Sequence, residues 1–148
     1  MRDDSAVVDR ETQTLTDVFG PVMDLYTRAN ALEDGQLIDV SATASEAGFR
    51  LPVAMTVAAW LDAVKWDGED NKKQGTAQDQ IGRLWDVLTM ARWAAQGQQA
   101  GRRRISFHVL RVPRDGRSSV PQILTLLLCI GPGDQRQAVL TITCVNED

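Results

Sequence analysis

Three carboxylates that bracket one turn come closest to a chemical site in this sequence. Glu33, Asp34 and Asp39 flank an Asp-Gly turn, and Glu46 follows them. Such carboxylates could ligate a divalent cation or form a general acid and base pair. A structural role is simpler, because Glu33 would end a helix, Asp34 would form the turn, and Asp39 would accept backbone donors before the next helix. We therefore treat these four residues as a candidate acidic binding surface.

Nucleophiles and metal ligands are sparse elsewhere. The one histidine, His108, lies in a predicted strand with no nucleophile placed beside it. Cys129 and Cys144 lie in apolar, strand-like surroundings that are typical of buried, reduced thiols. The segment GPGDQRQ lacks the Lys-Ser/Thr pair of a P-loop, and WDGEDN lacks the ligand spacing of a calcium loop. We expect no catalytic residue, no metal, no cofactor and no enzymatic activity.

Arginine is the one concentrated residue type. Its guanidinium forks suit phosphate and carboxylate groups, and clustered positive charge can follow a nucleic-acid backbone. Two groups of arginines flank a predicted strand, roughly 30 Å apart at the usual rise per residue. No aromatic residues alternate with them, as they would in a base-stacking surface. A nucleic-acid site and a solvated rim are equal alternatives for this candidate basic binding surface, which comprises Arg102, Arg103, Arg104, Arg111, Arg114 and Arg117.

Charge is segregated along the chain. Residues 1 to 70 contain 14 acidic residues and 5 lysines or arginines, whereas residues 71 to 118 contain 3 and 10. Unless the fold interleaves these segments, one part of the surface is acidic and another is basic. The 148 residues, 43% hydrophobic and 24% charged, fit a single globular domain. No apolar run reaches the roughly 20 residues of a membrane span, and no secretory signal is visible, so we expect a cytoplasmic protein.

The elements that position these side chains follow an N-terminal arm. Residues 1 to 11 are polar and aperiodic and predict a flexible arm, whereas residues 12 to 148 predict a single α+β domain. Thr12 or Thr14 would cap a short helix that ends near Gly20.

Several helix caps and turns come next. Thr27 is placed to cap a short helix and Gly35 to end it, because glycine adopts the left-handed conformation without steric cost. Residues 37 to 40 predict a strand. Thr43 and Glu46 have the spacing of a capping box, which predicts a further short helix.

The middle of the chain predicts two helices around a loop. Apolar residues recur every three or four positions from 57 to 64, which predicts an amphipathic helix. Residues 66 to 77 contain two glycines and mixed charges, which predict an exposed loop. Residues 78 to 98 give the strongest helix signal, with an apolar stripe composed of Ile81, Leu84, Trp85, Leu88, Ala91 and Ala95.

From residue 102 the apolar period changes from helical to alternating. Ile105, Phe107 and Val109 would face the core from one strand, and residues 121 to 131 and 136 to 145 would form a hairpin. In that hairpin Cys129 would lie opposite a residue near 138, and Cys144 opposite a residue near 123.

The predicted fold class is α+β, with N-terminal helices packed on one face of a mainly C-terminal antiparallel sheet of three to four strands. The optional fourth strand is the one at residues 37 to 40. An uncovered edge of such a sheet would pair two copies into a homodimer.

The block YTRANALEDGQLIDVSATASEAGFRLPVAMT, followed in order by GRLWDVL, FHVLRVPRDG and LCIGPGD, carries a family pattern. It resembles small uncharacterised proteins carried by bacterial plasmids, integrated elements and phages, which share YTRxxAIEDGxLxDVSxxAxEAGFxxPVAxT. Leu32 and Leu37 stand here where relatives often have isoleucine and another aliphatic residue. The resemblance implies an accessory gene of a mobile element and carries over no catalytic residue.

We therefore expect a non-enzymatic accessory binding protein of a mobile element or phage. The sharpest form of this hypothesis is an anti-defence inhibitor, of the anti-restriction or anti-CRISPR type, that binds a host or defence-system protein. The acidic N-terminal half could imitate DNA phosphates or engage a basic protein surface. The alternative is a nucleic-acid-binding or regulatory protein that uses the arginine patches, whose affinity would fall steeply with salt.

Overall fold

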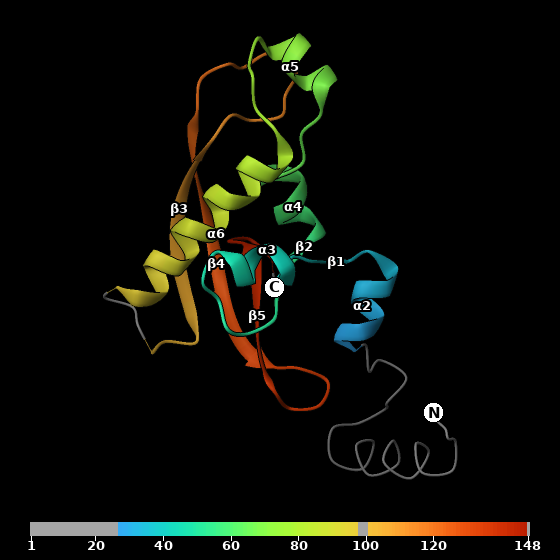
Figure 1. The fold of residues 1–148 in the computed structure, drawn as a ribbon, viewed down its shortest axis with the longest axis vertical. Helices are drawn as coiled ribbons and strands as arrows, with labels where there is room; N and C mark the ends of the chain where they lie inside the picture. Colours follow the sequence, from blue (N-terminus) through green and yellow to red (C-terminus); the bar gives the residue numbers. More distant parts are fainter. Residues whose placement is uncertain (1–26, 98–100, 148) are drawn as a thin grey trace.

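A computed structural model describes residues 27–97 and 101–147 of the chain (Figure 1). The expected arm at residues 1 to 11 and the helix expected after Thr12 or Thr14 lie outside these ranges. The described elements are α2 (Arg28–Asp34), β1 (Leu37–Asp39), α3 (Ser41–Glu46), β2 (Val53–Thr56), α4 (Val57–Ala63), α5 (Gly68–Gln74), α6 (Gln80–Gln96), β3 (Arg104–Arg111), β4 (Gln122–Pro132) and β5 (Ala138–Cys144). The α+β class is confirmed.

The sheet has five strands within the described residues, in the order β1-β2-β5-β4-β3. Neighbouring strands are antiparallel except β2 and β5, which are parallel. The expected antiparallel sheet of three to four strands is therefore wrong in strand number and direction. Val53–Thr56 is a strand that the sequence did not predict, and its first three residues are buried and pair with β5. A short, continuously apolar run is typical of a parallel strand buried on both faces.

One face of the sheet carries the core. Met55, Leu126, Leu128 and Ile142 are fully buried on it and belong to one cluster with residues of α3, α4 and α6. The predicted inward face of β3 is confirmed, because Ile105, Phe107 and Val109 are buried there. Helix α2 lies on the other face of the sheet. Arg28 Nη1 donates to the Thr141 hydroxyl at 2.7 Å. Because side chains alternate along β5 and the neighbouring Leu140 and Ile142 face the core, Thr141 points to the opposite face.

Helix α6 is confirmed, but its apolar stripe is rotated relative to the prediction. Leu84, Leu88 and Ala91 are buried as expected, whereas Ile81 is 60% exposed. Arg83 is buried in the first turn instead. At 3.6 residues per turn, positions 81 and 83 lie on nearly opposite sides of the helix, so burying Arg83 exposes Ile81.

The cap predictions succeed at α2 and fail at α3. The Thr27 side chain accepts from Asn30 N at 2.9 Å, and Gly35 ends α2 at a φ of 81°. Helix α3 begins after Val40 with no side-chain cap, so the capping box at Thr43 is wrong. The Ser41 hydroxyl instead bonds to the backbone of β2, accepting from Val53 N at 3.0 Å.

Residues 66 to 77 are not the expected loop, because they contain α5. Asp67 accepts from Asp70 N at 3.0 Å, and Asp70 accepts in return from Asp67 N at 2.9 Å. This reciprocal capping box satisfies backbone donors that would otherwise be unpaired at the helix N-terminus. Gly75 ends the helix at a φ of 64°.

The hairpin of β4 and β5 has a register three residues from the predicted one. Cys129 lies opposite Thr141, and Cys144 lies opposite Leu126. The difference arises because β4 continues through Gly131 and Pro132 before it turns. In the described ranges, no helix has the length and apolarity needed to cross a bilayer.

Candidate functional site

A groove of about 460 Å³ lies between α6 and the edge strand β3, and we call it the edge groove. Its lining is mainly apolar. Leu110 and Ile123 are directly opposite each other in the register of β3 and β4, and they are 62% and 68% exposed. The full lining consists of Asp86, Thr89 and Met90 from α6, His108, Val109 and Leu110 from β3, and Ile123 from β4.

Strand β3 forms one edge of the sheet, where Figure 1 shows it beside α6. Among the described strands it pairs only with β4. Arg103 O accepts from Ile130 N at 2.8 Å, which fixes the phase of this antiparallel ladder. Since alternate residues bond to the partner strand, Val109 directs its backbone groups toward β4, whereas His108 and Leu110 direct theirs away from it.

This edge has few of the features that usually prevent strand addition. β3 runs for eight residues with unbroken pairing to β4 and contains no proline. Its core-facing residues Ile105, Phe107 and Val109 are all apolar. Natural edge strands are more often short, bulged, interrupted by proline or marked by inward charges. β1, at the opposite edge, has only three residues.

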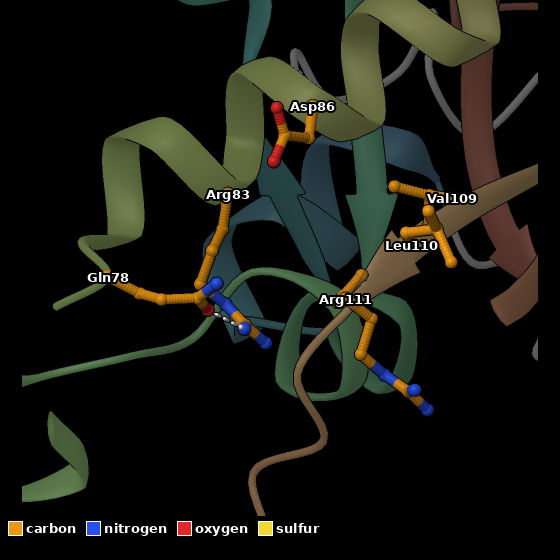
Figure 2. Close-up of a pocket in the computed structure, with 7 residues that line it drawn as sticks. Gln78, Arg83, Asp86, Val109, Leu110 and Arg111 are labelled. Atoms are coloured by element: carbon orange, nitrogen blue, oxygen red, sulfur yellow. Dashed lines mark hydrogen bonds between the residues drawn. The ribbon is translucent and has the colours of Figure 1, made fainter. Parts of the chain in front are cut away.

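A small cavity of about 10 Å³ adjoins one end of the edge groove, which we call its inner end. Asp86, Val109 and Leu110 line both spaces. Figure 2 shows Arg83 and Asp86 extending from α6 toward this cavity, with β3 across from them. A volume near 10 Å³ holds about one water molecule and excludes a larger ligand.

Arg83 joins three segments at this inner end. Its Nε donates to Val64 O at 3.1 Å, and its Nη1 donates to Val112 O at 3.0 Å and to Gln78 Oε1 at 2.7 Å. Its guanidinium carbon lies 4.5 Å from the centroid of the Trp66 ring. Burial, with a smaller effect from Arg111, lowers the pKa of Arg83 to about 10, so it remains a cation at neutral pH.

The Nη2 atom of Arg83 is buried and has no hydrogen-bond partner among the described residues. The adjacent cavity is large enough for one water molecule, which would satisfy such a donor. Arg83 is therefore a structural connector between α4, α6 and the end of β3.

Two arginines of the predicted basic surface are held in ion pairs. Arg111 Nη2 lies 2.9 Å from Asp62 Oδ1, and Arg114 Nε lies 2.8 Å from Asp70 Oδ2. Arg114 also reaches Asp67 at 3.4 Å. Opposite charges at these distances reduce the field that the arginines project into solvent.

The other predicted basic residues lie at the two ends of β3 and are exposed. Arg102, Arg103 and Arg104 lie at its start. Arg117 lies in the loop after β3, in a turn where Asp115 accepts from Arg117 N and Ser118 N, both at 2.8 Å. Hydrogen bonds from Ser118, with a smaller one from the Arg117 backbone, lower the pKa of Asp115 to about 2. The six arginines therefore do not form one continuous patch.

The four predicted acidic residues are all exposed but lie on different elements. Glu33 and Asp34 end α2, and Asp39 accepts from Ser41 N at 2.9 Å. Glu46 ends α3, which packs against α6 on the core face. Since α2 lies on the opposite face, the structure does not gather all four carboxylates into one cluster.

Asp86 differs from these residues because it lines a groove and has no partner. No hydrogen bond or ion pair joins its side chain to any other part of the described chain. Desolvation raises its pKa, and the positive charge of Arg83 only partly opposes that shift. A carboxylate in such a position gains by meeting a donor from outside the chain.

His108 and the cysteines show no arrangement for nucleophilic chemistry. His108 is exposed, and its Nδ1 lies 2.8 Å from the Thr125 hydroxyl. Both cysteines are half-buried and unpaired with each other, and burial with the nearby Glu147 raises the pKa of Cys144 to about 11. Within the described ranges, no three His, Cys, Asp or Glu side chains are grouped as metal ligands.

A family model matches residues 17–148, and its description is a family of unknown function (DUF6573). The chain belongs to this family. The DUF6573 match includes every described element and thus all of the edge groove. No curated protein and no solved structure matches the chain.

Sequence reasoning missed Asp86, Thr89, Met90 and Ile123 as site residues. Only Leu110 gave a signal, because an apolar residue on the outward face of a predicted strand is exposed unless something covers it. The chain contains many carboxylates, and nothing local distinguishes Asp86 from the others. Its place beside an edge strand depends on the packing of α6 against β3.

Proposed function

We propose that this protein is a non-enzymatic binding protein that holds an extended segment of a partner protein alongside β3. The supporting observation is that outward-directed backbone groups of β3 and an apolar groove lie side by side. The backbone groups of His108 and Leu110 point away from β4, and an apolar groove lies directly beside them. An added strand would use the first feature for hydrogen bonds and the second for its alternate side chains.

The size of the edge groove suits this role. Sites for small molecules commonly have volumes of about 300–1,000 Å³ and few polar groups. The groove has about 460 Å³ and two exposed apolar side chains, Leu110 and Ile123, at its rim. Covering apolar surface contributes about 25 cal/mol per Å², and each added backbone hydrogen bond contributes about 1 kcal/mol.

The family resemblance supports the choice of partner. An accessory protein of a plasmid, integrated element or phage acts on the cell that carries it, and an anti-defence inhibitor would bind a host or defence-system protein in the cytoplasm. Inhibition by strand capture needs no catalytic residue. The protein would act by occupying a segment that its target requires.

Nucleic-acid binding through the arginines is the alternative. It is weakened by the ion pairs of Arg111 and Arg114, which leave the exposed arginines at the two ends of β3. Arg102, Arg103 and Arg104 would then carry most of the contact. The alternative predicts retardation of DNA or RNA at low salt that is lost steeply as salt rises.

A display selection tests the proposal. A library of random ten-residue peptides is selected on the full chain, on His108→Pro and on the matched control His108→Ala. Proline removes an N–H that points away from β4, so the ladder between β3 and β4 is retained, as it is for prolines in natural edge strands. Alanine keeps that N–H.

The proposal expects wild type and His108→Ala to enrich extended, apolar-rich peptides and His108→Pro to lose them. Circular dichroism and urea unfolding verify that His108→Pro is folded. The proposal is wrong if the wild-type chain enriches no peptide, or if a folded His108→Pro enriches the same ones.

A further inference from the structure

We infer that the segment captured in the edge groove carries a lysine or arginine that pairs with Asp86, two positions from an apolar residue that packs on Met90. This inference rests on the proposed function and specifies which segments the groove accepts. Three observations lead to it: the unpaired state of Asp86, the spacing of the α6 side chains, and the closed inner end of the groove.

Among the described residues, Asp86 is the one acidic residue that lines the edge groove. Its side chain has no hydrogen bond or ion pair within the described chain. Arg83, whose charge acts on the pKa of Asp86, donates from Nε and Nη1 to Val64, Gln78 and Val112, and its Nη2 is enclosed. The carboxylate thus loses part of its hydration to the groove wall without receiving a compensating bond. A cation from a bound segment would supply that bond.

The spacing of α6 side chains sets the position of the second contact. Asp86 and Met90 are four residues apart on one helix, so their Cβ atoms lie about 6 Å apart. Residues i and i+2 of an added strand face the same side and lie about 6.6 Å apart. One side of the strand can therefore place a basic residue on Asp86 and an apolar residue on Met90 at the same time.

The residue between these two faces the opposite side of the strand. There it meets the exposed side chains of Leu110 and Ile123, so an apolar residue fits best. The accepted pattern is basic-apolar-apolar, in either chain direction, since an edge strand can pair in parallel or antiparallel fashion.

The inner end of the groove selects against an acidic residue. Arg83 Nη2 is the only unpaired cationic donor there, but it is enclosed, and the cavity beside it holds about one water molecule. A carboxylate on the bound segment would meet Asp86 without reaching Arg83. Like charges at that position repel.

A second copy of this chain is a poor occupant. Its own β3 offers Arg111 and Val109 at the required spacing, but Arg111 is already paired with Asp62 at 2.9 Å, and Val109 is only 3% exposed. To dock in this way, the second copy would have to break its Arg111–Asp62 pair and expose its buried Val109. The groove is thus directed at a different protein.

The experiment extends the peptide selection to Asp86→Asn and Asp86→Lys. The full chain is expected to enrich lysine or arginine two positions from an apolar residue. Asp86→Asn should keep the apolar preference and lose the basic one, and Asp86→Lys should enrich aspartate or glutamate at the same position. Because Asp86 is exposed, both variants should fold, which urea unfolding verifies.

Anisotropy measurements on a fluorescein-labelled peptide of the selected sequence give the magnitude. Replacing its basic residue by glutamine should weaken binding to wild type about 5-fold, as for a favourable exposed ion pair, and should not affect binding to Asp86→Asn. Equal binding of the two peptides to wild type, with binding still abolished by His108→Pro, would overturn the inference and leave the proposed function standing.

Two outcomes would overturn both. One is the absence of any peptide sensitive to His108→Pro. The other is a stable dimer in sedimentation analysis that dissociates in His108→Pro, because the edge would then be occupied by a second copy.

Discussion

Arg111 and Asp86 line the same small cavity, yet the Arg111 side chain is held in an ion pair and the Asp86 side chain is not. Arg83, Arg111 and Arg114 form what we call the paired region, together with the groups that they bind in α4, α5 and the end of β3. Arg83 and Arg111 also line the cavity. In the paired region nearly every charged or polar side chain has a partner within the chain. In the edge groove, Asp86 has no hydrogen bond or ion pair among the described residues, and Leu110 and Ile123 are exposed.

The difference indicates where to search for function. The paired region contains several arginines, but their charge is used within the chain to connect α4, α5, α6 and the end of β3. The edge groove contains little charge, but its carboxylate, Asp86, has no hydrogen bond or ion pair among the described residues. A partner binds where it can satisfy such groups, so the less conspicuous region is the better candidate.

The largest expected effect in the paired region is that of Arg83→Met. The change leaves the carbonyls of Val64 and Val112 buried without a donor, and it should lower the free energy of unfolding by about 3 kcal/mol. Urea unfolding measures the change. The exposed Arg117→Met serves as control and should change stability by less than about 0.5 kcal/mol. Similar losses in both variants would show that Arg83 is not a connector.

Gln74→Ala should have the next largest effect. The buried Gln74 amide donates to Pro113 O at 2.7 Å and to Ser118 O at 2.6 Å, and it accepts from Gly116 N at 3.1 Å. Its loss should cost about 2 kcal/mol, because three backbone groups lose their partner. Lys73→Ala, at the neighbouring exposed position, should be almost neutral. Thermal unfolding compares the two variants, and equal midpoints would contradict the prediction.

Asp70→Asn should change how stability depends on pH. Desolvation acts to raise the pKa of Asp70, but hydrogen bonds from Asp67 N and Arg114 outweigh it and lower that pKa below 3.8. A carboxyl whose folded pKa is lowered stabilises the fold above its unfolded pKa and loses that effect as pH falls through the folded value.

Wild type should therefore lose stability more steeply than Asp70→Asn as pH falls below the ordinary aspartate pKa of about 4. Urea unfolding at a series of pH values from 7 to 2 measures this difference. Glu69→Gln, whose side chain is 70% exposed, is the matched control and should follow wild type. Parallel pH profiles for Asp70→Asn and wild type would sink the prediction.

The smallest effect on stability is expected in the edge groove. The pKa of Asp86 is raised, so its ionised form destabilises the fold slightly, and that cost is present once pH exceeds the folded pKa. Asp86→Asn should leave the unfolding midpoint at pH 7 unchanged or slightly higher. A clear loss of stability would mean that Asp86 has a structural partner and belongs with the paired region.

Much of the fold was predictable from local signals. Thr27 and Gly35 have cap chemistry that depends on a few neighbouring residues, and the alternation around Phe107 identifies β3 and its inward face. Helix α5 was also within reach, because Asp67 and Asp70 have the spacing of a capping box. Its two glycines and mixed charges are also typical of a loop, so the local sequence favours both structures.

Other features depend on contacts between distant parts of the chain. Val53–Thr56 is a strand because it lies beside β5, which is more than eighty residues away in sequence. Arg83 is buried because α4 and the end of β3 supply acceptors for it. The edge groove could not be predicted for the same reason, since it exists only where α6 packs against β3.

The position of β5 also has a consequence for how the protein forms during synthesis. β5 lies between β2 and β4, so it is the strand that joins the hairpin of β3 and β4 to the earlier pair β1 and β2. On the ribosome both pairs emerge before β5 does, and each waits with an unsatisfied inner edge. Non-local pairing of this kind slows folding and exposes such edges to aggregation. The step that places β5 between them is therefore the one at which the folding chain is most exposed to aggregation.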